Sequence, residues 1–205
     1  MALSAMAQGM VLGASMIIPI GAQNSFILSQ GIRRNHHYLI ASICLFCDVV
    51  LTLIGVFGGA KLINSNDILL ALIGGGGILF LSIYALIAFR RAWQFNYSNG
   101  ARESTGLTRK TAIVATLAVT LLNPHVYLDT VVILGSVGGT FSDDARLYFA
   151  VGCILAATMW FYSLAAGASK LAPLLAKPKN QRKVDMFIGL VMAALAIRLF
   201  VTFFV

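Results

Sequence analysis

Hydrophobic residues fill six long stretches of the chain, and short polar segments separate them. The stretches cover residues 5–28, 38–57, 68–89, 111–135, 147–168 and 184–205. Each is long enough to cross about 30 Å of hydrocarbon as an α-helix, which takes roughly 20 residues. A segment that crosses a bilayer must also satisfy its own backbone polar groups, and a helix does so. The pattern therefore predicts an all-α integral membrane protein with six transmembrane helices.

Composition and charge agree with a protein that is embedded in a lipid bilayer. Of the 205 residues, 59% are hydrophobic and 11% are charged, and the mean hydropathy is +0.88. These values exceed what a soluble domain needs to bury one core. The net charge of +8 raises the question of nucleic-acid binding. The basic residues lie in short segments between apolar stretches and form no continuous basic face, so we expect no nucleic-acid partner.

The distribution of Lys and Arg predicts how the chain is oriented. The first, third and fifth connecting segments hold two, five and five of the fifteen basic residues. The positive-inside rule places these segments in the cytoplasm and both termini in the periplasm. The first stretch, however, is interrupted at Pro19 and Gly21. If it enters and leaves the membrane on one side, the N-terminus is cytoplasmic and five crossings remain.

A polar segment, residues 90–110, divides the chain into two parts with three apolar stretches each. We interpret residues 1–89 and 111–205 as two three-helix repeats and residues 90–110 as a basic cytoplasmic linker. Because three crossings reverse the direction of the chain, the second repeat must insert upside down relative to the first. Such a 3+3 inverted repeat is typical of secondary transporters.

Interruptions at matching positions support the two-repeat interpretation. Pro19 lies in the first stretch of the first half, and Pro124 lies in the first stretch of the second half. Five residues after each proline comes a polar side chain, Asn24 in one half and Asp129 in the other. Both prolines lie ~20 Å from the start of their stretch, so helices one and four are predicted to break near the middle of the bilayer. Two ordinary proline kinks are the alternative.

Two acidic residues, Asp48 and Asp129, lie deep inside predicted transmembrane helices. A charged side chain at the centre of a bilayer costs roughly 2.5–3.5 kcal/mol, so such acids are candidates for a function. We expect them to bind a cationic substrate, to accept protons, or to do both. Asp48 is ~15 Å from the cytoplasmic end of its helix and is the candidate for the central site. The alternative is a structural ion pair, for example with Arg198.

Other polar groups near the breaks complete the candidate site. A carboxyl group that takes either a proton or a cation makes the two compete, as antiport requires. His125 could join a proton relay or form a local hydrogen bond. We expect Gln23, Asn24 and Asn123 to shape the pocket. Backbone N–H groups beside Gly21 or Asn123 could hold a substrate carboxylate, because helix N-termini carry partial positive charge.

Further motifs indicate alternative functions. Cys44 and Cys47 form a C-x-x-C before Asp48, which would suit redox transfer or a path for metal ions. A membrane scaffold without a transport cycle is another alternative. No motif of a hydrolase is present, so neither an enzyme nor a cofactor is expected. Gly9 and Gly13 form a GxxxG motif, which indicates close helix packing within the chain or in a homodimer.

Two longer motifs resemble a known family. The segment PIGAQNSFILSQGIRRNHH begins at Pro19, and LLNPHVYLDTVVILGSVGG follows about a hundred residues later. Together they resemble the LysE family of lysine and arginine exporters, and most closely its arginine-exporting branch. The resemblance covers essentially the whole chain, including the six apolar stretches, the basic central segment, and Trp160 with Phe161 in the fifth stretch.

The motifs of the family transfer to this chain residue by residue. They fall on Pro19, Gly21, Gln23, Asn24, Gln30, Gly31, Arg33 and Arg34, then on Asp48, and then on Asn123, Pro124, His125, Tyr127, Leu128 and Asp129. Ala22 departs from the pattern, which has a proline there, so the first break depends on Pro19 and Gly21. The resemblance implies export of L-arginine across a bacterial inner membrane, with lysine and canavanine as further candidate substrates.

Export of arginine from a cell that is negative inside requires energy. Arginine carries a net charge of +1, and moving it outward costs ~2.3 kcal/mol per 100 mV. Exchange for one proton is electroneutral, exchange for two protons also uses the potential, and two intramembrane acids permit either. We therefore expect proton antiport, in which Asp48 alternates between proton and substrate, Asp129 lies on the outward path, and the two halves rock to give alternating access. Export of another small solute or of a metal cation is the alternative.

Overall fold

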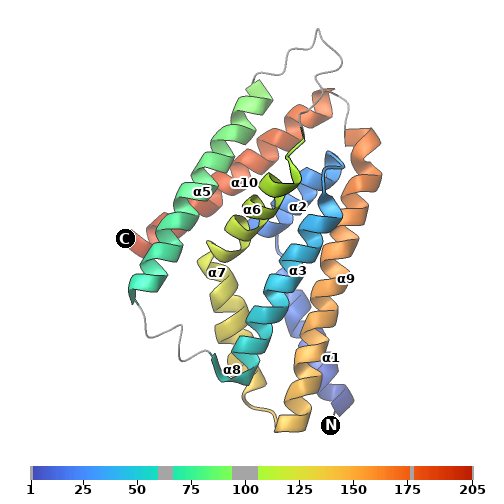
Figure 1. The fold of residues 1–205 in the computed structure, drawn as a ribbon, viewed down its shortest axis with the longest axis vertical. Coiled ribbons are helices and arrows are strands. Elements are labelled where there is room, and N and C mark those ends of the chain that lie inside the picture. The colour runs from blue at the N-terminus through green and yellow to red at the C-terminus, as the bar shows by residue number, and fades with distance from the viewer. Residues whose placement is uncertain (1, 60–66, 94–105, 176–177, 205) are drawn as a thin grey trace.

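The computed structural model describes residues 2–59, 67–93, 106–175 and 178–204, and this part of the chain is helical with no strands (Figure 1). The α-helices are α1 (Ala2–Ile17), α2 (Ala22–Ile32), α3 (His37–Ile54), α5 (Asp67–Trp93), α6 (Arg109–Leu121), α7 (Pro124–Val126), α8 (Leu134–Gly138), α9 (Asp143–Leu175) and α10 (Pro178–Phe204). Two π-helical segments, η1 (Gly55–Gly59) and η2 (Tyr127–Ile133), continue α3 and α7. The all-α prediction is confirmed.

The prediction of six transmembrane helices, the first and fourth of them broken, is confirmed in part. In the described ranges, four helical spans are long and apolar enough to cross a membrane: His37–Gly58, Gly75–Trp93, Asp143–Pro173 and Arg182–Val201. A fifth crossing arises if α1 and α2, which are bent by 75° at their junction, count as one span. This geometry fits a broken span or a re-entrant loop, the two arrangements that the interrupted first stretch allows.

The first break lies where the sequence places it. Pro19 has no backbone N–H and disfavours helical geometry at the residue before it, so α1 ends at Ile17. Gly21 then adopts an extended conformation (φ −108°, ψ −169°), and α2 begins at Ala22. The chain turns within four residues and continues in a new direction.

The fourth predicted stretch, 111–135, is likewise not one helix. It consists of nearly all of α6, the short helix α7, the π-helical η2 and the start of α8, and none of these is a candidate for crossing a membrane alone. Asn123 interrupts the helix immediately before Pro124, which begins α7. The predicted break near Pro124 is therefore present. The middle of the predicted linker, 94–105, lies outside the described residues.

Basic residues gather at one end of the molecule, the upper end in Figure 1, which we call the basic end. The ends of α2, α5 and α9 and the starts of α3, α6 and α10 meet there (Figure 1). Described basic residues at this end are Arg33, Arg34, Arg90, Arg91, Arg109, Lys110, Lys170, Arg182 and Lys183. The start of α1 and the start of α9 lie at the opposite end (Figure 1).

The two halves of the chain make equivalent helix contacts. The broken pair α1–α2 packs on α9, and the broken segment from α6 to α8 packs on α3. The third long helix of each half, α5 or α10, packs on the other. The set of neighbours stays the same if each helix is replaced by its counterpart in the other half. The counterparts are α1–α2 and α6–α8, α3 and α9, and α5 and α10.

Glycines allow backbones to approach closely at these contacts. A Cβ atom on Gly9 would lie 2.1 Å from the carbonyl oxygen of Phe149, and one on Gly152 would lie 2.1 Å from that of Met6. The GxxxG motif of α1 therefore packs on α9 within the chain. In the other half, a Cβ atom on Gly135 would lie 2.6 Å from the carbonyl oxygen of Gly55.

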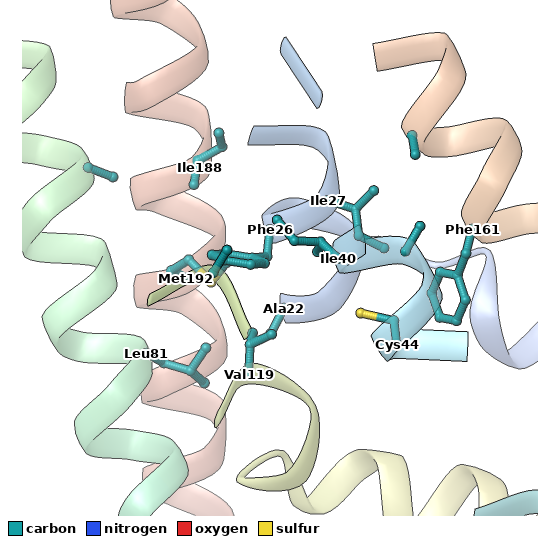
Figure 2. Packing of buried hydrophobic residues seen from close by; sticks show 14 of the residues in the cluster. Ala22, Phe26, Ile27, Ile40, Cys44, Leu81, Val119, Phe161, Ile188 and Met192 are labelled. Atoms are coloured by element: carbon teal, nitrogen blue, oxygen red, sulfur yellow. The ribbon is translucent and has the colours of Figure 1, made fainter. Parts of the chain in front are cut away.

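Buried apolar side chains form a main cluster toward the basic end. It includes Phe26, Cys44, Phe161 and Met192, which come from four different helices (Figure 2). A second cluster, which includes Phe149, joins α1, η1, α8 and α9 at the opposite end. The space between the two clusters is where the breaks in the helices lie.

We expect Gly152→Ala to destabilise the protein by about 1–3 kcal/mol, because a methyl group would collide with the backbone of α1. Gly167→Ala is the matched control on the same helix, since nothing lies within 4 Å of its Cβ position. It should stay within about 1 kcal/mol of the parent protein and gain helix propensity. Thermal unfolding of the purified protein in detergent measures both, and equal midpoints for the two variants would contradict the packing described.

Candidate functional site

A cavity of about 250 Å³ lies at the two helix breaks. Its lining includes eight of the nine predicted site residues, namely Pro19, Gly21, Gln23, Asn24, Asp48, Asn123, His125 and Asp129. The ninth, Pro124, begins α7 at the edge of the second break. The volume is close to the lower limit of pockets for small molecules, about 300 Å³. The cavity therefore has a suitable size for a single small solute.

Asn24 closes the first break. Its side-chain amide donates hydrogen bonds to the carbonyl oxygens of Ile17 (2.7 Å) and Pro19 (2.8 Å), which lie at and just beyond the end of α1. Its own oxygen accepts a hydrogen bond from Nε1 of Trp160 on α9 (3.1 Å). Asn24 thus satisfies backbone groups that the break releases and ties them to a neighbouring helix. Asn24 therefore stabilises the break and also lines the cavity.

Gln23 connects three helices beside the cavity. Its Nε2 donates to Oδ1 of Asp48 on α3 (3.3 Å) and lies 3.2 Å from Oγ1 of Thr120 on α6. Asp48 is 8% exposed. Among the described residues, no Lys or Arg side chain forms an ion pair with Asp48. The carboxyl group therefore lies in the protein interior beside the cavity, with an uncharged amide as its hydrogen-bond donor.

The second break is closed in a similar way. Oδ1 of Asn123 accepts a hydrogen bond from the backbone N–H of His125 (3.2 Å), which is the geometry of a helix N-cap. The hydroxyl group of Tyr127 donates to the carbonyl oxygen of Leu121, the last residue of α6 (2.9 Å). In the described part of the chain, Nε2 of His125 is buried and has no hydrogen-bond partner. The local hydrogen bond that was the alternative to a proton relay is therefore not observed at Nε2 of His125.

Asp129 differs from Asp48 in its surroundings. It lies in the π-helical η2, a rare form of helix that is frequent at functional sites. It is half-buried, and both His125 and Arg198 are close enough to act on its charge. Arg198 lines the same cavity from α10. Arg198, considered above as the partner of a structural ion pair, therefore acts electrostatically on Asp129.

Most of the main cluster lies between the cavity and the basic end, and a few of its members also line the cavity. On α3, Cys44 belongs to the cluster, whereas Asp48, about one turn further from the basic end, lines the cavity. On α10, Met192 belongs to the cluster and Arg198, further along, lines the cavity. Figure 2 shows side chains of the cluster that come from several helices, among them Phe26, Cys44, Phe161 and Met192. The cavity is therefore closed toward the basic end in this structure.

Several polar residues of the site were missing from the sequence prediction. Thr52 and Thr120 are buried beside Asp48 and Gln23, and Trp160 orients Asn24. The spacing of Thr52, four residues after Asp48 on one helix face, is a signal that could have identified it. Contacts of Thr120 and Trp160 join distant parts of the chain, so no local pattern marks them.

The structure gives no support for a metal path through the cysteine motif. Among the residues that are described, no group of three or more His, Cys, Asp or Glu side chains is placed to hold a metal ion. Sγ of Cys44 lies 3.8 Å from Oγ1 of Thr120, and Cys44, Cys47 and Cys153 are buried free thiols.

Comparison with known proteins gives a consistent result. The family model described as LysE type translocator matches residues 14–202. A putative amino-acid transporter, YggA of Aeromonas salmonicida, is 50% identical over 192 residues, which are 94% of this chain and 93% of that protein. The arginine exporter proteins ArgO of Pectobacterium atrosepticum and Yersinia enterocolitica are 44% and 45% identical, with 94% of each chain covered. No solved structure matches the chain.

We expect Asn24→Ala to lower the free energy of unfolding by about 1–3 kcal/mol, because it leaves buried carbonyl groups without a donor. The same substitution at the second break, Asn123→Ala, removes one cap and should cost about 1 kcal/mol. Thermal unfolding in detergent gives both values. A loss at Asn24 no larger than that at Asn123 would show that Asn24 does not hold the first break closed.

Proposed function

The chain belongs to the family of LysE type translocators, and from this premise we propose that it exports basic amino acids, chiefly L-arginine, across the inner membrane of a bacterium. Two relatives at 44% and 45% identity carry the name arginine exporter. The family model matches residues 14–202, which include every residue lining the cavity except Gly13. Lysine and canavanine, which share a cationic side chain with arginine, are secondary substrates.

The observation that carries this proposal is the setting of Asp48. A carboxylate in the interior of a membrane protein is costly unless it is protonated or meets a cation. Asp48 is buried at the cavity wall, and its partner in the structure is the uncharged amide of Gln23. A proton or the cationic side chain of a substrate can each satisfy this group. One site then exchanges the two, which is the chemistry of proton antiport.

The zwitterionic part of an amino acid has its own candidate partners. The first N–H groups of an α-helix have no acceptor within the helix, and they carry partial positive charge. α2 begins at Ala22, and Gly21 and Ala22 both line the cavity. The carboxylate of the substrate binds at this helix start, and its cationic side chain reaches toward Asp48. Asp129, beside Arg198 and His125, lies on the outward path of the substrate, between Asp48 and the periplasmic side.

Alternating access follows from a 3+3 inverted repeat of residues 1–89 and 111–205. Support comes from the contacts, which keep the same neighbours when the halves are exchanged, and from a helix break in each half. In inverted-repeat transporters the site lies at the interface of the repeats, and the repeats rock around it. Gln23 of the first half and Thr120 of the second meet at the cavity, so rocking would alter the surroundings of Asp48.

The orientation follows from the basic end. Because positively charged segments remain in the cytoplasm, the basic end is cytoplasmic, and the two termini lie outside. The main cluster then closes the cytoplasmic side of the cavity. Thiol labelling of single cysteines at residues 34 and 142 from outside intact cells tests this, and labelling at residue 34 but not 142 would reverse the orientation.

We expect Asp48→Asn to reduce proton-driven arginine export at least a hundredfold, because the amide neither takes up a proton nor pairs with a cation. Arginine efflux from preloaded vesicles with an imposed pH gradient measures this. Asp144→Asn, which changes an exposed acid outside the cavity, is the matched control and should retain full activity. Undiminished pH-driven export by Asp48→Asn would refute the role of Asp48.

We also expect recognition to depend on the positive charge of the substrate side chain. Counterflow of labelled arginine into vesicles of purified protein should be inhibited by lysine and canavanine. Citrulline, which has nearly the same shape as arginine without its charge, should inhibit at least tenfold less, because it cannot pair with a carboxylate. Equal inhibition by citrulline would contradict a carboxylate site, and no counterflow at all would favour a scaffold without a transport cycle.

A further inference from the structure

A second buried carboxylate, Asp185, lies at the basic end and takes no part in the cavity. It is 5% exposed and forms an ion pair with the guanidinium of Arg33. Arg33 caps the C-terminal end of α2, and Asp185 lies roughly 10 Å along α10 from Pro178. The pair therefore joins the first half of the chain to the second at the end where the cavity is closed.

The electrostatic surroundings make Asp185 unusual. Among the described residues, the other acids lie in the cavity or at the opposite end of the molecule, where α5 and α9 begin with Asp67 and Asp143. Asp185 is thus the one described acid at an end that is otherwise rich in Lys and Arg. Among the described residues, this carboxylate is therefore the acidic group at the basic end that attracts a cation.

Buried polar side chains connect Asp185 with the cavity along α2. Ser25, Ser29 and Gln30 are each at most 2% exposed. Nε2 of Gln30 and Oγ of Ser29 both lie 3.5 Å from the hydroxyl group of Tyr84 on α5. In the described part of the chain, Oγ of Ser25 is buried without a hydrogen-bond partner. Polar groups thus follow α2 from Gln23 at the cavity to Arg33 at the basic end.

Apolar packing closes this line of polar groups in the structure. The ring of Phe26 packs edge-on against Tyr84, with 5.6 Å between the ring centroids, and belongs to the main cluster. Polar side chains that point into a protein interior in the membrane commonly mark a path for a polar solute. The buried polar side chains along α2 thus connect the cavity with the basic end, and apolar side chains pack against them in this structure.

We propose that Asp185 is an inner binding site for the cationic side chain of the substrate, and that the guanidinium of Arg33 occupies this site while the path is closed. This inference rests on the proposed export of basic amino acids. Arg33 carries the same chemical group as arginine, so substrate and Arg33 compete for one carboxylate. Substrate that displaces Arg33 releases the contact between α2 and α10 and allows the basic end to open.

A purely structural ion pair explains less. Buried ion pairs contribute little net stability, because the desolvation of both charges offsets their attraction. The pair also lies at the junction of the two halves, which must separate at this end if the cavity is to reach the basic side.

The test is uptake of labelled L-arginine by inside-out membrane vesicles, which present the basic end to the medium. We expect Asp185→Asn to raise the KM for arginine at least tenfold, because one charge-assisted hydrogen bond to the substrate is lost. Asp185→Glu keeps the carboxylate and should raise the KM less. Arg33→Ala removes the competitor and leaves the carboxylate, so its KM should stay equal or fall. Arg34→Asn is the control, because it removes the neighbouring basic side chain. Arg34 has a φ of 51°, which Asn tolerates, so the KM of this variant should equal that of the parent protein.

If Asp185→Asn fails to reach the membrane, the double variant Arg33→Ala with Asp185→Asn leaves no unpaired buried charge, and its KM is compared with that of Arg33→Ala alone. An unchanged KM in Asp185→Asn, or an equal rise in Asp185→Asn and Arg33→Ala, would overturn the proposal, because the pair would then only hold the helices together. Absence of arginine uptake by the parent protein would instead refute the proposed export function, before any variant is compared.

Discussion

A helix that breaks inside a membrane exposes backbone N–H and C=O groups where no lipid can bond them. This protein breaks two helices and meets the demand with a few side chains. Asn24 bonds the carbonyl groups of Ile17 and Pro19, and Tyr127 bonds that of Leu121 across the second break. These hydrogen bonds satisfy the carbonyl groups at the end of the helix before each break. The cavity lies at the two breaks, where α2 and α7 begin.

Close backbone contact is the second condition for this arrangement. Short segments such as α2 and α7 bury little surface alone, so they depend on tight packing against long helices. Glycines on both sides of the contacts of α1 with α9, and of α8 with η1, permit it. Packing is also uneven along the molecule, since the main cluster fills the side of the cavity toward the basic end. In the transport cycle proposed above, this structure corresponds to a state in which apolar packing lies between the cavity and the basic end.

Sequence reasoning succeeded where a local rule applies. Hydropathy identified the helical stretches, the prolines identified both breaks, and two motifs identified the family that the comparison then confirmed. It predicted the break in the fourth stretch but not how that stretch divides into α6, α7, the π-helical η2 and α8. Asn24 was predicted as a pocket residue and lines the cavity, but the hydrogen bonds by which its amide closes the break were not predicted. Asp185, at the edge of the sixth stretch, could not be paired with Arg33 because 152 residues separate them.

The sequence alone determined that this chain is helical, embedded in a membrane, interrupted twice and equipped with deep acids, because each of these features depends on the identity of neighbouring residues and on the length of an apolar run. The tertiary structure decided that Asp48 forms no ion pair with a described Lys or Arg, whereas Asp129 lies near Arg198. It also decided that the candidate residues share one cavity and that its basic side is closed. Those outcomes depend on contacts between helices distant in sequence, which hydropathy and spacing do not encode.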